Sequence, residues 1–357
     1  FKMDCLIKLA AFPGDFVLLI GSISSMKNRE TQFDQAIELL KPFTAKNIRR
    51  ANWYFFSTIF VLWTSILLSA YFVVFFPLGL LLSIPITTAF MCRSYVIEHD
   101  CGHGSFYRTE TANFIAGNLM GFGILIPYSL WKYIHHSHHM HVGNLDKRSF
   151  NPEIWTMTLD EYRNSAVMKR LAYRFMRSKF TRFTLTPTIN LGLMFRLIHP
   201  RFNWKANVSV VLHDLLYAFI LWKIHAYFSW TNLFIIFYIP LVIFYFVASY
   251  TFYAQHQFED TYWEKEDLWH YQEASFYGAT YIAAPKWYCW LTGNVVFHNI
   301  HHLMSGIPFY RLEEAKERFG QTLPYRMIPL SEVWKMLSLK VWDENQKKLV
   351  PIPRNQK

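Results

Sequence analysis

Four long apolar stretches constrain this 357-residue chain more than any other feature of its sequence. A helix needs about 20 mostly apolar residues to cross a lipid bilayer, and each of these stretches is about that long. Only short turns separate the first stretch from the second and the third from the fourth. The sequence therefore predicts an all-α integral membrane protein with four transmembrane helices in two hairpins: Trp53–Phe75, Leu78–Ile97, Val208–Phe228 and Leu233–Ala254.

A fifth apolar run, Phe114–Leu130, is rich in glycine and contains Pro127. Its length is marginal for a membrane span, and irregular backbone at membrane depth must be buried in protein. We expect this run to be half-buried or re-entrant instead of spanning.

The distribution of charge predicts an orientation. The formal net charge is +11, yet the turns at Phe76-Pro77 and at residues 229–232 carry no lysine or arginine. By the positive-inside rule, the termini and the central region face the cytoplasm and the two turns face outward. The basic surface suits anionic lipid head groups. No compact basic motif indicates nucleic acid as a partner.

The domain organisation follows from these stretches. Residues 1–25 are predicted to be a non-functional leader, 26–50 an N-terminal cytoplasmic helix, 51–345 the membrane domain and 346–357 a C-terminal tail. Residues 144–205 are basic and aromatic, which is typical of helices lying on a membrane. A cytoplasmic helical cap follows the last span and includes an amphipathic helix near Leu312–Phe319.

Nine histidines lie at or just beyond the ends of apolar stretches. One metal ion takes three or four imidazole ligands, so nine predict two metal ions. With two hairpins, all the clusters fall on one side of the membrane, where they can share a site. The predicted ligands are His99, His103, His135, His138, His139, His256, His298, His301 and His302.

Their spacing fits helices that present several ligands to one cavity. His99 and His103 are four residues apart, and two HxxHH triplets, at 135–139 and 298–302, have offsets of three and four. Such residues share one helix face, so each triplet can aim three imidazoles at one cavity. Histidine without paired cysteine disfavours structural zinc and iron–sulfur sites. Nitrogen-rich, carboxylate-poor ligation with open positions suits oxygen-reactive iron.

The remaining polar residues near the clusters leave alternatives open. We expect His136 and His141 to be exposed or to support a ligand. His213 and His225 are expected in packing or interfacial roles, and His199 and His270 at the surface. Metal-bound histidines usually donate their other N–H to a carboxylate or carbonyl. The candidates for that role, which could equally be caps or solvated groups, are Asp100, Asn299, Glu259 and Asp260.

The clusters match the three histidine boxes of the integral-membrane fatty acid desaturases, which this chain resembles over roughly residues 50–345. The boxes read HDCGH at 99–103, HHSHH at 135–139 and HNIHH at 298–302. Gln255-His256 precedes the third box, as in the acyl-lipid branch. The segments 143–148 and 255–263 are similar to bacterial acyl-lipid desaturases in particular.

The resemblance implies a di-iron (Fe²⁺) site, O2 as co-substrate and an external electron carrier, either ferredoxin-like or a b-type cytochrome. The expected reaction introduces a cis double bond into an acyl chain of a membrane lipid, in a bacterial inner membrane. The first box has three residues between its histidines, where the acyl-CoA branch of the family has four, and this difference favours an acyl-lipid substrate. Phe106, Trp131 and Trp263, near the boxes, are candidates for lining an acyl tunnel, and the alternative role for such aromatics is anchoring at the membrane interface. The alternatives are a di-iron hydroxylase of the same superfamily and a metal transporter.

Overall fold

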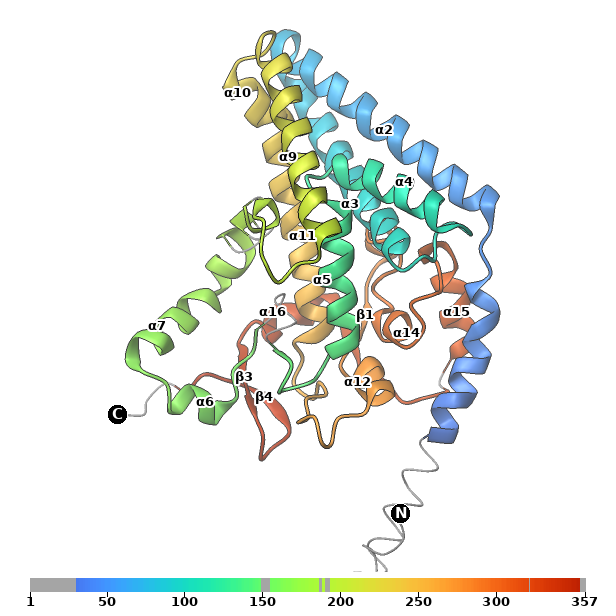
Figure 1. The fold of residues 1–357 in the computed structure, drawn as a ribbon, viewed down its shortest axis with the longest axis vertical. Helices are drawn as coiled ribbons and strands as arrows, with labels where there is room; N and C mark the ends of the chain where they lie inside the picture. The colour runs from blue at the N-terminus through green and yellow to red at the C-terminus, as the bar shows by residue number, and fades with distance from the viewer. Residues whose placement is uncertain (1–29, 149–154, 186–187, 190–192, 321, 354–357) are drawn as a thin grey trace, which may run out of the picture.

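The computed structural model describes residues 30–148, 155–185, 188–189, 193–320 and 322–353. The described chain is mostly helical, and four of its helices are long and apolar enough to cross a membrane, as predicted. The predicted leader, residues 1–25, lies outside the described residues. Residues 30–40 form a helix that runs beside the part of the fold holding α14 and α15 (Figure 1).

The first two long helices are α2 (Ile48–Phe75) and α3 (Leu80–Gly102), which pack along each other. The side chain of Asn47 caps α2 by accepting hydrogen bonds from two backbone N–H groups of its first turn. The helix ends before Pro77, which opens the short 3₁₀ turn η2 (Pro77–Gly79). The second helix runs five residues beyond the predicted end at Ile97 and so carries the first histidine box.

Small polar side chains join α2 to α3. Ser69 Oγ lies 2.8 Å from Ser83 Oγ, and Thr87 donates to Ser65 Oγ at 2.9 Å. These four side chains are buried, and their size lets the two backbones approach closely. The polar groups are satisfied within the helix pair, which suits an environment without water.

The second pair of long helices begins with α9 (Trp204–His225) and continues through α10 (Trp230–Leu233), η6 (Phe234–Tyr238) and α11 (Ile239–His256). The π-helical turn η6 precedes Pro240, which lacks the N–H that a regular helix would use. The two helices pack on different neighbours, because α11 contacts α3 whereas α9 contacts α5.

The fifth apolar run forms two helices instead of one. They are α4 (Glu110–Phe122), capped by Thr109, and α5 (Tyr128–His141), which carries the second histidine box. A non-helical segment that contains Pro127 separates them. Neither helix is among the candidate spans, and α5 packs between α3 and α9.

Most of the remaining elements form a cap below the long helices in Figure 1, whereas η4 packs beside α11 and η5 beside α9. Two short sheets correct the all-α prediction: β1 pairs with β2 in parallel, and β3 pairs with β4 antiparallel. The amphipathic helix predicted near Leu312–Phe319 is present as α15. The elements of the central region are α6 (Leu159–Arg163), α7 (Val167–Met176), η4 (Thr181–Leu185) and η5 (Met194–Arg196). The elements after the last long helix are α12 (Tyr271–Tyr277), β1 (Tyr281–Ala283), α13 (Lys286–Leu291), α14 (His298–Leu303), η7 (Phe309–Arg311), α15 (Leu312–Phe319), β2 (Met327–Pro329), η8 (Leu330–Glu332), α16 (Val333–Met336), β3 (Leu339–Asp343) and β4 (Lys348–Pro351).

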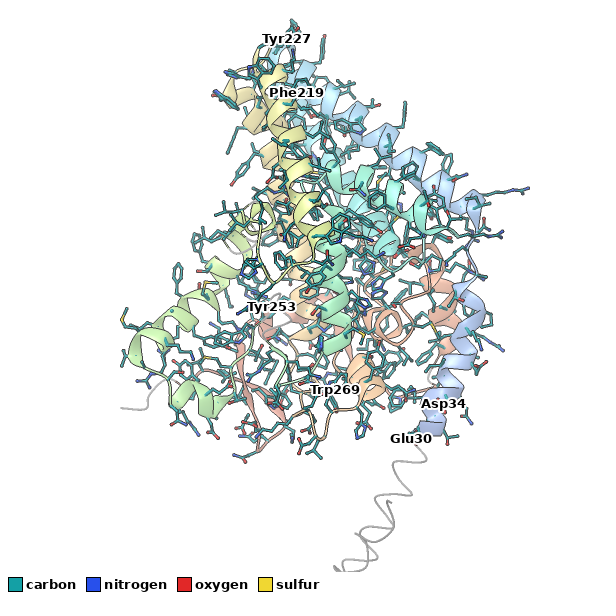
Figure 2. All side chains as sticks on the ribbon, in the orientation of Figure 1. Glu30, Asp34, Phe219, Tyr227, Tyr253 and Trp269 are labelled. Carbon is teal, nitrogen blue, oxygen red and sulfur yellow. The ribbon has the colours of Figure 1, made fainter. Side chains whose placement is uncertain are left out.

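The two ends of the molecule differ in character (Figure 2). Phe219 and Tyr227 lie at the end where the long helices turn, and Tyr227 is 85% exposed. Glu30 and Asp34 lie at the opposite end, beside the cap. Between Val208 and Trp222 the exposed residues of α9 are all apolar, and only Ala206 and Val210 of the helix are buried. Exposed apolar area of this kind is what a lipid bilayer would cover.

Candidate metal centre

Four helix ends converge at the junction between the long helices and the cap. The end of α3, the second half of α5, the end of α11 and the start of α14 each bring histidines to this junction. All nine predicted ligands lie there, eight buried and His103 half-buried. Their ring nitrogens form two groups, and within each group the candidate ligand atoms lie within 4.8 Å of one another.

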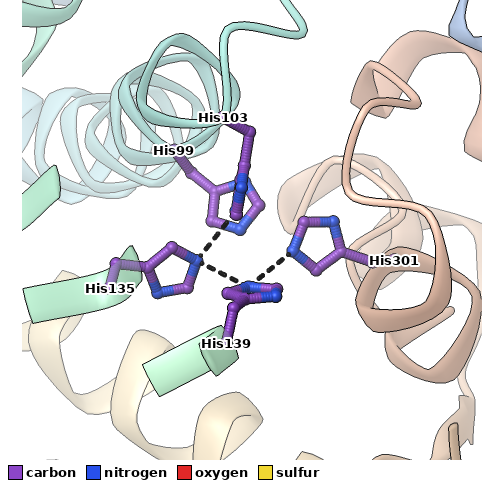
Figure 3. A group of neighbouring side chains, drawn as sticks. All are labelled: His99, His103, His135, His139 and His301. Carbon is purple, nitrogen blue, oxygen red and sulfur yellow. Dashed lines mark hydrogen bonds between the residues drawn. The ribbon is translucent and has the colours of Figure 1, made fainter. Parts of the chain in front are cut away.

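The first group contains five histidines (Figure 3). His135 Nε2 lies 3.0 Å from His103 Nε2 and 3.1 Å from His139 Nε2. His301 Nε2 lies 3.3 Å from His139 Nε2. His99 completes the group, with its ring centroid 4.5 Å from that of His301. Three segments of the chain therefore supply this group.

The second group contains four histidines. His138 Nε2 lies 3.2 Å from His256 Nε2 and 3.3 Å from His302 Nε2. His298 Nε2 lies 2.9 Å from His256 Nε2 and 3.1 Å from His302 Nε2. His256, the single histidine before the third box, thus belongs to the site together with the two triplets.

The grouping corrects one expectation from the spacing. Each HxxHH triplet was expected to aim three imidazoles at one cavity, but both triplets are divided. On α5, His135 and His139 join the first group while His138 joins the second. On α14, His298 and His302 join the second group while His301 joins the first. Adjacent helical residues point about 100° apart, so each triplet reaches both groups.

Two structural observations indicate that the histidine groups could bind metal ions: an unpartnered buried nitrogen and the spacing of the ring nitrogens. His99 Nε2 is buried without a hydrogen-bond partner among the described residues, although its other nitrogen is paired. Two imidazole nitrogens bound to one ion at about 2.1 Å lie about 3 Å apart when their bonds are near a right angle. The observed separations of 2.9–3.3 Å agree with that arrangement.

Burial keeps these imidazoles neutral. Removal from water lowers the pKa of His135, His139, His298, His301 and His302 well below the ordinary value, and the neighbouring histidines lower it further. A neutral imidazole has a free lone pair, which is the form that binds a metal ion.

Two hydrogen bonds orient ligands from behind. Asp100 Oδ1 lies 3.1 Å from His99 Nδ1, and Asp100 Oδ2 accepts the backbone N–H of Phe309 at 2.6 Å. His256 Nδ1 lies 2.9 Å from the carbonyl oxygen of Gly278. Each bond leaves Nε2 of the ring directed at the site. The sequence pointed to Asp100, whereas a backbone carbonyl such as that of Gly278 has no sequence signal.

The other predicted polar neighbours lie elsewhere. Glu259 pairs with Lys348 at 3.0 Å, and Asp260 lies 3.7 Å from a nitrogen of Arg326. Both carboxylates are on the surface of the cap. Asn299 is buried in α14, and its side chain makes no hydrogen bond to a described residue.

The remaining histidines lie outside both groups. His141 Nδ1 is 2.9 Å from the carbonyl oxygen of Ser137, and His213 Nδ1 accepts a hydrogen bond from Arg196 at 2.7 Å. The others are exposed, as expected for surface or interfacial residues: His136, His199, His225 and His270.

A narrow, mostly apolar pocket touches both histidine groups, and its empty space, including the part open to the outside, is about 550 Å³. His99 and His135 of the first group and His298 of the second form its floor. Its walls come mainly from α3 and α11: Cys92, Tyr95, Val96, Phe244, Val247, Ala248, Thr251, Phe252 and Gln255, with Thr292 and Val295 before α14. Between Phe244 and Gln255 the pocket follows about 16 Å of α11.

The three aromatic candidates for lining a tunnel do not line this pocket. Trp131 stacks on the ring of His135 with a centroid distance of 4.5 Å. Phe106 is fully buried against Phe309 and Tyr107 in the core. Trp263 lines a smaller pocket beside His138 and His256.

Comparison with known proteins identifies the family. The fatty acid desaturase family profile matches residues 73–334, which include all nine histidines of the two groups. The chain belongs to the fatty acid desaturase family. The resemblance predicted from the three boxes is confirmed, and so is the enzyme class, an oxidoreductase. A metal transporter is not supported.

Curated relatives of this desaturase come from bacteria and plants. A fatty acid desaturase of Bacillus subtilis is 34% identical over 270 residues, which cover 74% of this chain and 75% of the relative. An sn-1 oleoyl-lipid 12-desaturase of Picosynechococcus is 26% identical, over 64% of this chain and 67% of the relative. An sn-1 acyl-lipid omega-3 desaturase (ferredoxin) of Synechocystis is 24% identical, over 70% and 69%.

Proposed function

We propose that this desaturase introduces a cis double bond into an acyl chain of a membrane lipid, using O2 and two electrons at a di-iron site. The first iron would be held by His99, His103, His135, His139 and His301, and the second by His138, His256, His298 and His302. The observation that carries the proposal is the apolar pocket with histidines of both groups in its floor.

The pocket suits an acyl chain because the polar side chains of Thr251 and Gln255 in its walls already have hydrogen-bond partners. Thr251 Oγ1 shares a hydrogen bond with Tyr288 Oη at 2.6 Å and donates to the carbonyl oxygen of Val247. Gln255 Nε2 donates to the carbonyl oxygen of Val295 at 2.8 Å. The walls thus offer mainly hydrocarbon contacts to a substrate, and an apolar occupant would exclude water from the histidine floor.

Bound iron would supply the oxidising power, together with O2, to remove one hydrogen from each of two adjacent carbons. An unactivated methylene group has no acidic proton, so side-chain acid–base chemistry cannot perform this step. The protein residues would hold the chain against the floor and keep the imidazoles oriented. Asp100 and the Gly278 carbonyl fix the rings of His99 and His256 for this purpose.

The orientation in the membrane is part of the proposal. The four candidate spans would cross a bacterial inner membrane as two hairpins, with the cap, the histidine centre and both termini in the cytoplasm. The turns at Pro77–Gly79 and at residues 226–229 contain no lysine or arginine. Lys223, in the last turn of α9, lies near the second of these turns. The cap and the central region carry most of the basic residues.

We propose an external carrier of electrons, ferredoxin-like or a b-type cytochrome. One relative is named for ferredoxin. The net charge of +11 would attract an acidic carrier. Screening at higher ionic strength should then slow turnover with that carrier, whereas a small uncharged reductant would be unaffected.

Expression in a host without acyl desaturases tests the proposal directly. Gas chromatography of the membrane lipids should show a new cis-unsaturated acyl chain that requires O2 and disappears in His298→Ala. The matched control is His270→Ala, which changes an exposed histidine outside both groups. A hydroxylated chain without a new double bond would instead identify a hydroxylase.

A further inference from the structure

A basic hollow lies at the N-terminal end of α2, apart from the histidine centre. Five cationic side chains line it, Lys46, Arg49, Arg50, Arg108 and Arg311, against the single carboxylate of Glu314. The hollow is open to the outside and has about 510 Å³ of accessible space, which is within the size range of ligand sites. Three separate parts of the chain build it: residues 45–50, the loop after the first histidine box and the region around α15.

Two of the arginines are fixed in place. Arg50 donates to Glu314 Oε1 at 2.5 Å and to the Tyr310 carbonyl oxygen at 3.3 Å. Arg311 donates to the carbonyl oxygens of Pro42 and Ala45 and lies 3.3 Å from Glu314 Oε2. Glu314 is therefore shared between both guanidinium groups, and it offsets only part of the positive charge. Because these two arginine side chains are already ordered, they lose little conformational entropy when a ligand binds.

The other three cations remain available. The side chains of Lys46, Arg49 and Arg108 make no hydrogen bond or ion pair with any residue that the structure describes. The first backbone N–H groups of α2 do not contribute, because Asn47 already accepts from those of Arg49 and Arg50. Anion binding would therefore come from side chains, which suit a phosphate group.

An apolar stripe continues from the hollow along α2. Arg49, Trp53, Phe56 and Phe60 follow one another at helical spacing on one face. Trp53 is 72% exposed, Phe56 63% and Phe60 70%. A cationic hollow at the end of an exposed apolar stripe on a candidate span has the polarity of a phospholipid, with an anionic head and hydrocarbon chains.

We propose that the hollow binds the phosphate head group of an anionic phospholipid, whose acyl chains lie along the Trp53–Phe56–Phe60 stripe. This site is separate from the acyl pocket, because no residue lines both. It would hold a lipid at the membrane surface beside the N-terminal end of α2 independently of catalysis. The cationic hollow selects a phosphate group, and the exposed apolar stripe selects a ligand with hydrocarbon chains.

Lipid titration of the purified full chain in neutral detergent, followed by native mass spectrometry, tests the proposal. Dioleoyl-phosphatidylglycerol should bind at least about tenfold more tightly than dioleoyl-phosphatidylcholine. Arg49→Gln/Arg108→Gln should weaken phosphatidylglycerol binding by roughly 10- to 30-fold, at about 1 kcal/mol for each charge lost. Both side chains are exposed, so the variant should fold.

The matched control is Arg201→Gln/Lys205→Gln, which removes the same charge at the N-terminal end of α9, another candidate span. Its affinity should stay within about twofold of the unmodified chain. An equal loss in both double variants would reduce the effect to diffuse surface charge and overturn the proposal. Unchanged affinity in Arg49→Gln/Arg108→Gln would overturn it as well.

Two further arms separate the lipid from other phosphate or acidic ligands. Glycerol 3-phosphate has the head-group chemistry without chains, and it should fail to displace phosphatidylglycerol at equal concentration. Phe56→Ser/Phe60→Ser should weaken the lipid several-fold. If Arg49→Gln/Arg108→Gln kept its lipid affinity but lost turnover with a reduced acidic carrier protein, the hollow would be a protein-docking surface and the lipid proposal would be wrong. The binding measurement requires no desaturase activity.

Discussion

Asp100 holds His99 by a hydrogen bond between neighbouring residues, with Asp100 Oδ1 3.1 Å from His99 Nδ1. The carboxylate can only accept, so His99 donates from Nδ1 and leaves Nε2 bare for the first histidine group. Its other oxygen accepts from the backbone of Phe309 and ties α3 to the cap. Asp100 is therefore a positioning residue for one of the nine candidate ligands.

Asp100→Asn should weaken the first metal position without unfolding the protein. The asparagine oxygen can still accept from Phe309, but its NH₂ would then face His99 and favour the tautomer whose Nε2 carries a proton. Loss of such a partner typically costs 10- to 100-fold in metal affinity or activity. Metal analysis of the purified variant should show less iron at a limiting supply. Asp260→Asn, which affects a surface ion pair, is the control.

Adjacent histidines on α5 should act on different metal ions. His135→Ala/His139→Ala removes two ligands from the first group, whereas His138→Ala/His139→Ala removes one from each. The first variant should retain close to one iron per chain, held by the intact second group. The second should lose iron from both positions. Elemental analysis distinguishes them, with His136→Ala as the exposed control, and equal iron content in the two double variants would contradict the grouping.

Gly102→Ala should disturb the site through Trp131. A Cβ at position 102 would lie 2.7 Å from Cζ3 of Trp131, closer than real contacts allow, and that buried ring stacks on His135. Overpacking of this kind costs about 1–3 kcal/mol of stability. We expect a lower melting temperature and less product per protein. Gly306→Ala is the control, because its Cβ would meet Thr44 at an ordinary 3.5 Å.

The four long apolar helices and the gathering of the nine histidines could be predicted from the sequence, because both depend on local pattern. Apolar length predicts a membrane helix, and offsets of three and four predict a shared helix face. The division of His138 from His139 could not be predicted, since it depends on how α5 and α14 are placed relative to each other. That placement is tertiary, and no spacing within either triplet encodes it.

The parts that the sequence did not predict are backbone-mediated or very short. The Gly278 carbonyl and the Phe309 N–H take part in the site, but every residue offers such groups. The strands β1 and β2 have three residues each, too few to show the alternation of a half-buried strand. Phe106, Trp131 and Trp263 are close to the boxes in the sequence, whereas the pocket is lined mainly by α3 and α11.

Ala248→Phe should block the acyl pocket without affecting the metal. Ala248 lies in the pocket wall about two turns of α11 before His256. A phenyl ring there would occupy space that a substrate needs, so product yield should fall at least about tenfold or shift to shorter chains. Iron content should stay unchanged. The control is Ile243→Phe on the same helix, since Ile243 is 41% exposed and does not line the acyl pocket.

The metal-free protein should lose stability as the pH falls below about 6.5, the ordinary histidine pKa in an unfolded chain. Burial lowers the pKa of His135, His139, His298, His301 and His302 in the folded state, so the unfolded chain takes up protons first. The contribution of these neutral imidazoles to the free energy of unfolding is complete above that pH and is lost as the pH approaches the lower folded-state pKa values.

Chelator-treated protein in detergent should therefore melt at similar temperatures at pH 7.5 and 8.5, and at lower temperatures towards pH 5. His139→Gln should reduce this dependence, because one buried titrating group is gone. A melting temperature that stays constant or rises on acidification would show that the buried imidazoles do not carry the depressed pKa values on which their neutral, metal-binding form depends.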